Sequence, residues 1–337
     1  MRSRTNKLNH PSGIEIETPI LVPSFSSKGF SFDSRGVSEA TDALNLSKEF
    51  LTECLLLSAY DLYHKHIPFS EEYLCTDFTI IDSGGYETSN IYDFSAIAKY
   101  SYPIKDWSLE KYESIIDQWP THKAGIIVSF DHGSNRSSLE QQIKNANDLF
   151  LKYPTFLNNF LIKPETENQK YIQVPNIIAQ ISALKSFTII GMTEKELGNS
   201  ILERMKNISK IRTALDDDSN NAPIHIFGSL DPITSLLYFL SGAEIFDGLT
   251  WLKYSYFNGS AIYQSNFGAL HNELGIHIRD SQIRSKSIVN NIYCLEKMKY
   301  QMKDFISSSN FDLFNELNDE LGDFLKKNFN TFESNLR

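Results

Sequence analysis

Short apolar runs recur along the chain, and the polar segments between them carry apolar residues at helical spacing. Continuous apolar runs are typical of parallel strands buried on both faces, and their alternation with helices predicts a right-handed βα repeat. Eight runs are predicted strands, at residues 19–23, 54–58, 78–82, 125–131, 156–163, 187–191, 224–228 and 244–247. The pattern predicts an α/β fold, a (β/α)8 or TIM barrel.

Four of the intervening segments have a clear helical pattern. They are residues 138–152, 174–187, 194–215 and 232–240. The second is apolar enough to form a strand, but Val174, Ile177, Ile181 and Leu184 recur at helical spacing. We therefore predict a helix for that segment.

Two stretches fall outside the repeat. Residues 84–124 are predicted to be an insertion at the rim after the third strand, where long loops form lids or partner surfaces. Residues 288–337 are predicted to be a helical extension that packs on the barrel of residues 1–287, with partner binding as the alternative. Aromatic residues are frequent in the insertion, namely Tyr86, Tyr92, Tyr100, Tyr102, Trp107, Tyr112 and Trp119. The extension has an apolar stripe of Ile292, Leu295, Met298, Met302 and Phe305.

Composition narrows the functional classes. The chain has 337 residues, of which 41% are hydrophobic, enough for a large core. Its net charge of −10 disfavours broad, non-specific nucleic-acid binding, which needs a surplus of Lys and Arg. The sequence contains neither a signal-peptide-like segment nor an apolar run of membrane-spanning length. Its three cysteines have no paired spacing. We expect a cytoplasmic protein without membrane contact.

Three of the predicted strands end in an aspartate. These are Asp82, Asp131 and Asp247, and the carboxyl ends of barrel strands are where barrel enzymes build their active sites. Three carboxylates on one rim are costly unless they serve a function, so the pattern favours an enzyme. The first aspartate opens the segment Asp82-Ser83-Gly84-Gly85-Tyr86, whose adjacent glycines would let backbone amides approach a flat ligand.

From residue 8 to about residue 305 the chain resembles the tRNA-guanine transglycosylase family. Its zinc-less character, described below, is similar to that of the divergent branch found in DNA modification and phage defence. The matching segments, in order, are His10-Pro11-Ser12-Gly13 with Glu17-Thr18-Pro19, Asp82 to Tyr86, Asp131, Gly191 with Glu196-Leu197-Gly198, and His225-Ile226-Phe227-Gly228 followed by Gly242 to Asp247.

The resemblance implies a role for each matching residue. Asp247 would attack the anomeric carbon of the sugar and form a covalent intermediate, and Asp82 would act as general acid and base. Asp131 would bind the amide and amino edge of guanine or a 7-deazaguanine, on which Tyr86 would stack. The remaining base contacts would come from Ser83, Gly84, Gly85, Gly191 and Gly228.

The chain departs from the family in several places. The family holds a structural zinc with three cysteines and a histidine, but no cysteine lies between Asp247 and Cys294, and Asn290 stands in the place of the histidine. We therefore expect neither zinc nor another cofactor. The family's base-recognising glutamine has no match, since Lys163 stands nearest to that strand end. Glu87 follows Tyr86 where the tRNA enzymes have glutamine. The roles of these two residues stay open.

Three hypotheses follow from the sequence. The first is a zinc-less enzyme that exchanges guanine or a 7-deazaguanine base on DNA or RNA, with the target nucleotide flipped out of any duplex. The second is a repurposed member of a phage-defence system, which binds a deazaguanine-type group and docks on a partner protein through the insertion or the helical extension. The third is an unrelated barrel hydrolase, for which a bound metal would be the test.

Overall fold

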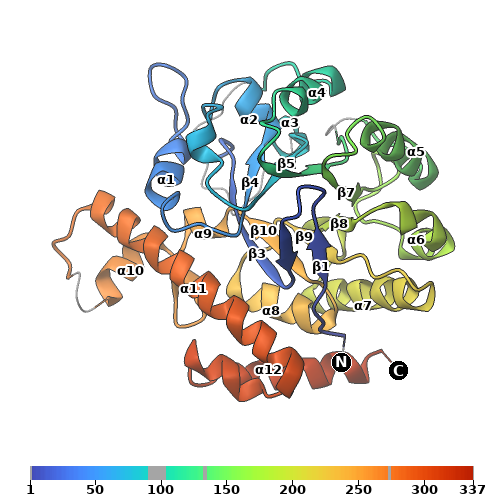
Figure 1. The fold of residues 1–337 in the computed structure, drawn as a ribbon. Helices are drawn as coiled ribbons and strands as arrows, with labels where there is room; N and C mark the ends of the chain where they lie inside the picture. The colour runs from blue at the N-terminus through green and yellow to red at the C-terminus, as the bar shows by residue number, and fades with distance from the viewer. Residues whose placement is uncertain (1, 90–103, 132–134, 272–274, 337) are drawn as a thin grey trace.

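The computed structural model describes residues 2–89, 104–131, 135–271 and 275–336. Eight parallel strands form a closed barrel in sequence order, and pairing of the last strand with the first completes it. The strands are β3 (Ile20–Phe25), β4 (Cys54–Ser58), β5 (Phe78–Asp82), β6 (Ala124–Val128), β7 (Leu157–Ile162), β8 (Ile189–Thr193), β9 (Ile224–Phe227) and β10 (Ile245–Gly248). The predicted (β/α)8 fold is confirmed (Figure 1).

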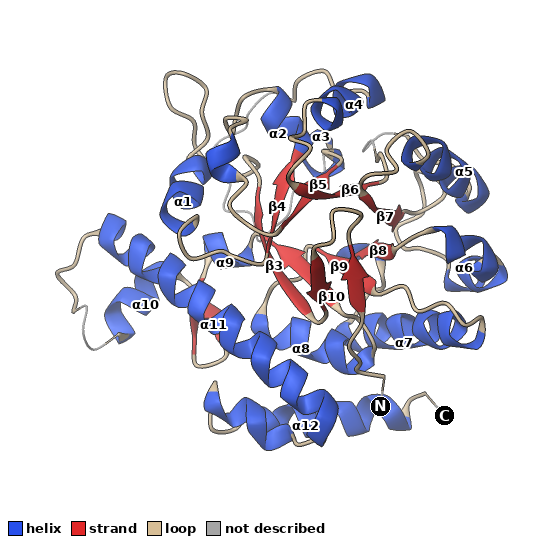
Figure 2. Ribbon diagram, in the orientation of Figure 1, coloured by secondary structure: helices blue, strands red, loops and turns tan. Residues whose placement is uncertain are grey.

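Helices surround the barrel on its outside (Figure 2). They are α1 (Ala40–Ser47), α2 (Ala59–Tyr63), α3 (Gly85–Thr88), α4 (Leu109–Asp117), α5 (Leu139–Phe150), α6 (Val174–Ala179), α7 (Ile201–Asp217), α8 (Pro232–Ser241), α9 (Thr250–Lys253), α10 (Gln264–Leu270), α11 (Asp280–Ser308) and α12 (Leu321–Ser334). Short 3₁₀ helices are η1 (Glu71–Tyr73), η2 (Ile181–Ser186), η3 (Glu194–Glu196) and η4 (Phe311–Glu316). Two antiparallel hairpins are formed by β1 (Lys7–Asn9) with β2 (Glu15–Glu17), and by β11 (Ser255–Phe257) with β12 (Ser260–Ile262).

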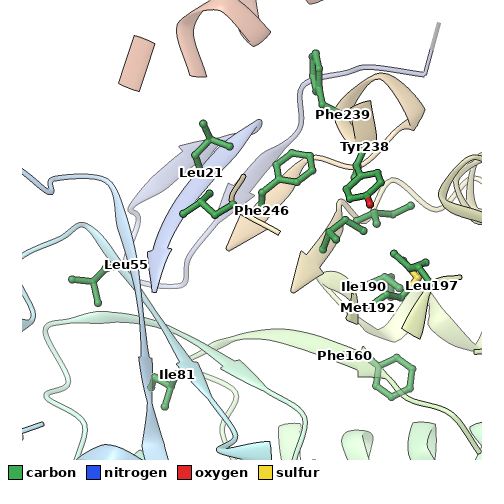
Figure 3. Packing of buried hydrophobic residues seen from close by; sticks show 14 of the residues in the cluster. Leu21, Leu55, Ile81, Phe160, Ile190, Met192, Leu197, Tyr238, Phe239 and Phe246 are labelled. Carbon is green, nitrogen blue, oxygen red and sulfur yellow. The ribbon is translucent and has the colours of Figure 1, made fainter. Parts of the chain in front are cut away.

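The apolar strand residues form two separate layers of core. Those that point outward pack under the helices, as Figure 3 shows for Leu21, Leu55, Ile81 and Phe160. Those that point inward fill the barrel together with Leu8 and Ile16 of the β1–β2 hairpin. In Figure 1 this hairpin, in dark blue, lies across the barrel. The continuous apolar runs of the sequence reflect this burial on both faces.

Two predicted helices differ from the observed elements. The segment 174–187 divides at Gln180 into α6 and the 3₁₀ helix η2. Its later apolar residues, Ile181, Leu184 and Phe187, are spaced by three, which is the repeat of a 3₁₀ helix. The helix predicted from residue 194 begins only at Ile201, after a 3₁₀ turn and Gly198. Residues 194–196 therefore belong to the rim of the barrel.

The stretch predicted as a rim insertion is only partly one. Its second half forms α4, the helix between β5 and β6, whose Tyr112 is completely buried. Trp107 and Trp119 are each 5% exposed, so these three aromatic side chains pack in the core and cannot form a lid or partner surface. Tyr92, Tyr100 and Tyr102 lie outside the described residues.

The carboxyl-terminal helices pack against the barrel helices. All five residues of the predicted apolar stripe on α11 are buried, with exposures of 6% or less. This confirms the expectation that the stripe is a packing surface within the chain. The helix starts at Asp280, so its first turns precede the boundary placed at residue 288. In Figure 1 α11 and α12, in orange and red, lie together beside α8 and α7.

Candidate active site

A cavity of about 540 Å³ opens at the carboxyl ends of the barrel strands. That volume is in the range of small-molecule binding sites. The three strand-end aspartates of the sequence, Asp82, Asp131 and Asp247, all line it. Asp131 lies three positions beyond Val128, the last residue of β6, and so belongs to the following loop rather than to the strand. The barrel thus brings together carboxylates that are far apart in the sequence.

Asp247 is held by three hydrogen-bond donors. Its Oδ2 accepts from Ser24 Oγ at 2.7 Å, and its Oδ1 accepts from the Gly228 amide at 3.2 Å. His225 Nε2 lies 3.1 Å from Oδ1, while Asn159 Nδ2 lies 2.8 Å from His225 Nδ1. Donation from the asparagine to Nδ1 assigns the imidazole proton to Nε2, which then donates to the carboxylate. These contacts fix the position of the Asp247 carboxylate in the cavity.

Asp82 ends β5, and its surroundings favour the protonated form. Burial raises the pKa of the Asp82 carboxyl to about 6, and the negative charges of Asp247 and Asp131 raise it further. The Gly84 amide donates to its Oδ2 at 3.0 Å and opposes the shift. A carboxyl group with a pKa near neutrality can both give and accept a proton. Two neighbouring carboxyl groups in different surroundings are a common arrangement for acid–base chemistry.

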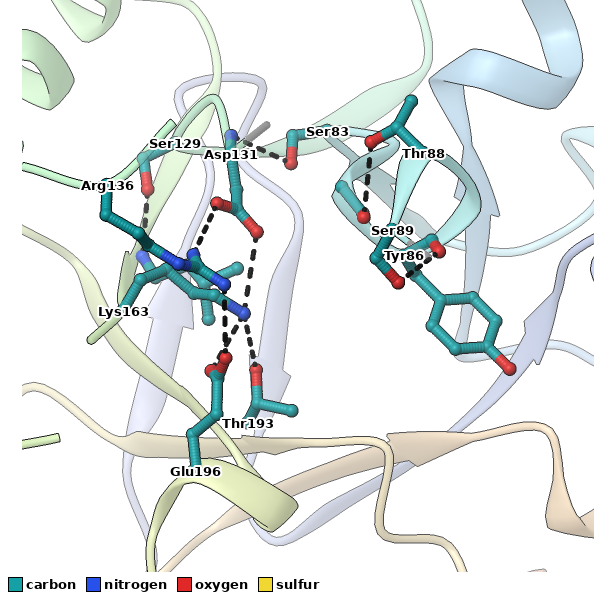
Figure 4. Close-up of polar contacts among 12 residues, drawn as sticks. Ser83, Tyr86, Thr88, Ser89, Ser129, Asp131, Arg136, Lys163, Thr193 and Glu196 are labelled. Carbon is teal, nitrogen blue, oxygen red and sulfur yellow. Dashed lines mark hydrogen bonds and ion pairs between the residues drawn. The ribbon is translucent and has the colours of Figure 1, made fainter. Parts of the chain in front are cut away.

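The third aspartate belongs to a cluster of ion pairs. Asp131 contacts Arg136 at 3.2 Å and Lys163 at 3.5 Å, and Glu196 contacts Lys163 at 2.7 Å and Arg136 at 3.5 Å. The four side chains are 10–14% exposed. Figure 4 shows the two basic side chains between the two carboxylates. The cluster is electrically balanced, and any ligand that binds to Asp131 must compete with two cations.

The Asp-Ser-Gly-Gly segment supports Asp131. Ser83 Oγ accepts a hydrogen bond from the Asp131 amide at 3.2 Å. A Cβ atom on Gly85 would lie 2.6 Å from Asp131 Oδ2, so this glycine gives room to a carboxylate of the same chain. Gly84 does not line the cavity; its φ of 84° and its packing against Tyr60 and Trp107 account for it. We had predicted ligand contacts for Gly84, which this placement contradicts.

The other two predicted glycines differ from each other. Gly228 lines the cavity, but its amide donates to Asp247. Gly191 does not line it, because the ring of Phe227 covers this glycine and would lie 2.6 Å from a Cβ there. The surface expected from Gly191 is therefore supplied by Phe227.

Tyr86 and Glu87 follow the double glycine on α3 and both line the cavity. Tyr86 is 38% exposed, and the Lys28 ammonium lies 4.4 Å from the centre of its ring. In Figure 4 this ring points away from Asp131. Glu87 is buried, and burial raises the pKa of its carboxyl to about 8.

Several cavity residues escaped the sequence interpretation. Ser24 and Arg136 carry no recognisable signal, because a serine in a strand and an arginine in a loop are common. Glu194 and Glu196 were placed in a helix, although Gly198 and the capping residue Ser200 mark a later start. Glu194 accepts from Arg204 and Tyr238, so its role is structural.

Within the described parts of the chain, no three His, Cys, Asp or Glu side chains are grouped in a way that could hold a metal ion. None of the described helices has the length and apolar character needed to cross a membrane. Comparison with models of known protein families gives no match, and comparison with curated proteins gives none either.

Proposed function

We propose that the chain is a tRNA-guanine transglycosylase-like enzyme that exchanges guanine or a 7-deazaguanine base on a nucleic acid. The observation that carries the proposal is the pairing of Asp247 and Asp82 in one cavity in different surroundings. Three donors position the first carboxylate, and the second has a pKa raised to about 6 by burial. This is the division between nucleophile and acid–base group that glycosyl transfer requires.

The reaction follows from these two groups. An Asp247 oxygen forms a bond to the anomeric carbon as the bond from that carbon to the base nitrogen breaks, and the departing base takes a proton from Asp82. The incoming base then gives a proton to Asp82, its nitrogen bonds to the anomeric carbon, and Asp247 is released. Because the second half returns the proton, no co-reactant is consumed.

The zinc of the transglycosylase family does not fit this chain. Among residues 248–293 there is no cysteine, and Asn290 stands where the family has its zinc-binding histidine. The Asn290 amide donates to the Tyr256 carbonyl at 2.7 Å, and its neighbour Asn291 donates to those of Trp251 and Tyr254. Hydrogen bonds between side chains and backbone tie α11 to the segment after β10, so no step of the proposal involves zinc.

The charge of the cavity bears on the acceptor. Its lining carries seven carboxyl groups against four basic side chains, which favours a flipped nucleotide over a long stretch of polynucleotide backbone. The carboxyl groups belong to Asp82, Glu87, Asp131, Glu194, Glu196, Asp231 and Asp247, and the basic groups to Arg136, Lys163, Lys195 and Lys253. Both DNA, as in the DNA-modification branch, and RNA are candidate substrates.

The test is label transfer. Radiolabelled guanine or 7-deazaguanine is incubated with the protein and with bulk tRNA or duplex DNA as acceptor. We expect label in one polymer, and a loss of at least about 10³-fold in Asp247→Asn, because an amide cannot form the glycosyl intermediate. Base binding should survive that substitution, and the exposed Glu140→Gln should behave as the wild type. Transfer by Asp247→Asn at the wild-type rate would disprove the nucleophile assignment.

One observation supports a second function. The carboxylate assigned to base recognition, Asp131, is bound to Arg136 and Lys163, so the site is suited to a ligand other than an unmodified guanine edge. This favours a phage-defence component that binds a deazaguanine-type group and docks on a partner protein with little exchange. The same assay separates the two: tight base binding with no label in any polymer would support the second function.

A further inference from the structure

Glu87 is a cavity residue to which the proposed base exchange assigns no part. It lies on α3 and is 6% exposed. Its Oε1 accepts a hydrogen bond from Ser26 Oγ, whereas Oε2 has no hydrogen-bond partner among the described residues. A buried polar atom without a partner costs free energy. Since Glu87 lines the cavity, a bound molecule can supply the missing partner.

The groups that face Glu87 are acidic or neutral. Asp61 on α2 and Asp82 on β5 are the charged groups that act on it most strongly, and both are carboxylates. The hydroxyl groups of Ser26 and Ser58 approach from β3 and β4. Ser58 Oγ also lines the cavity and likewise has no hydrogen-bond partner within the described part of the chain.

The next shell does not neutralise this acidity. Asp61 accepts from the Ser27 hydroxyl at 2.5 Å and contacts His66 Nδ1 at 2.9 Å, so its cationic partner lies on the side away from Oε2 of Glu87 in the hydrogen-bond network. Lys28 contacts α3 through the carbonyl oxygen of Tyr86.

These surroundings keep a proton on Glu87. Burial raises the pKa of its carboxyl to about 8, and Asp61 and Asp82 add to the effect. At neutral pH the group is therefore mostly uncharged and has one O–H donor. Because Oε1 already accepts from Ser26, Oε2 is the atom placed to carry this proton. As the pH rises through 8, the donor is lost and a buried negative charge replaces it.

We propose that Glu87 donates a hydrogen bond from Oε2 to an acceptor atom of the bound base, a carbonyl oxygen or an unprotonated ring nitrogen, with Ser58 as a second contact. This assignment rests on the proposed function, because it takes a base as the ligand of the cavity. It makes Glu87 a specificity-determining residue that selects heterocycles with an acceptor at that position, and it makes binding sensitive to alkaline pH.

Calorimetric titration with guanine and with 7-deazaguanine, from about pH 6 to about pH 10, tests the assignment. The wild type should lose affinity above about pH 8, by up to tenfold per unit. Glu87→Gln keeps an N–H donor at all pH values, so its affinity should lack this component. Glu87→Ala should lose about tenfold in affinity at pH 7. Glu140→Gln, on the exposed face of α5, is the matched control and should follow the wild type.

A second readout needs no ligand. The infrared C=O band of a protonated carboxyl group should be present in the free protein at pH 7, shrink as the pH passes 8, and be absent in Glu87→Gln. Base binding with identical pH profiles in wild type and Glu87→Gln would overturn the Glu87 assignment and leave the base-exchange proposal standing. Failure of both bases to bind any variant would overturn both.

Discussion

On one side of the cavity two carboxyl groups lie beside other carboxyl groups, whereas on the other side two carboxylates share two basic side chains. We refer to the first as the proton-carrying wall, Asp82 and Glu87, and to the second as the ion-paired wall, Asp131, Glu196, Arg136 and Lys163. The first wall has pKa values raised to about 6 and about 8 and can move protons near neutral pH. The second holds fixed, balanced charges and can recognise a ligand only by exchanging partners.

This difference separates chemistry from recognition. Burial without a cation keeps a proton available, which a general acid needs. An ion-paired carboxylate is ordered and costly to disturb, which suits a surface that rejects most ligands. Asp247 stands apart from both walls, because its partners are neutral donors: a serine hydroxyl, a backbone amide and a histidine with an assigned tautomer.

The largest effect is expected from Asp82→Asn. It should lower turnover about 10²- to 10⁴-fold, because the departing base loses its proton donor. In the wild type, single-turnover release of base should slow as the pH rises above about 6, since the fraction of protonated Asp82 falls. The variant should lack this slope, while its affinity for the free base should change little. An unchanged slope in Asp82→Asn would assign the titration to another group.

The proton-carrying wall was partly predictable from sequence, and the ion-paired wall was not. Asp82 follows a buried apolar run and opens a glycine pair, so local pattern alone marks it. Asp131 was found as an aspartate after a strand, but its partners come from three other segments. Nothing local connects Arg136 or Lys163 to Glu196, since their meeting depends on barrel closure.

The fold was more predictable than the site. Each of the eight predicted strands overlaps an observed one, because burial on both faces leaves a strong apolar signal. The errors fell where several structures suit the same pattern, as in the three-residue spacing of η2. Gly191 was wrongly placed at the ligand, because a glycine that makes room for a neighbouring ring has the same sequence signal as one that makes room for a ligand.

A smaller effect is expected from Lys163→Met in the ion-paired wall. Asp131 and Glu196 would then share one arginine, and removal of one partner from a largely buried pair should cost about 2–3 kcal/mol of unfolding free energy. Urea denaturation measures this loss. In Lys163→Met with Glu196→Gln the charges balance again, and part of the stability should return.

The matched control is Lys144→Met on α5, whose partner Asp148 is four residues away. These side chains are 67% and 59% exposed, and loss of such a surface pair should cost less than about 0.5 kcal/mol. Equal losses for the Lys163 and Lys144 variants would mean that the cluster is solvated and that the contrast between the two walls has no energetic basis.

The smallest effect tests whether the walls are coupled. Gly85 lies in the segment that begins with Asp82, yet an added Cβ would lie 2.6 Å from Asp131 Oδ2. Gly85→Ala should therefore displace the carboxylate of the opposite wall, at a cost of about 1 kcal/mol, or about fivefold in base affinity. Its backbone φ is not in the left-handed region, so the substitution adds no conformational strain.

A double-mutant cycle with Asp131→Ala identifies the route of this effect. If Asp131 contacts the base, Gly85→Ala should weaken binding in the wild-type background and have little further effect once the carboxylate is gone. The base affinities of the four proteins, measured by calorimetry, give the coupling directly. Equal losses in both backgrounds would show that the added methyl group acts on the ligand itself. Gly85 would then line the base site as the sequence predicted, and the ion-paired wall would contribute to stability rather than to recognition.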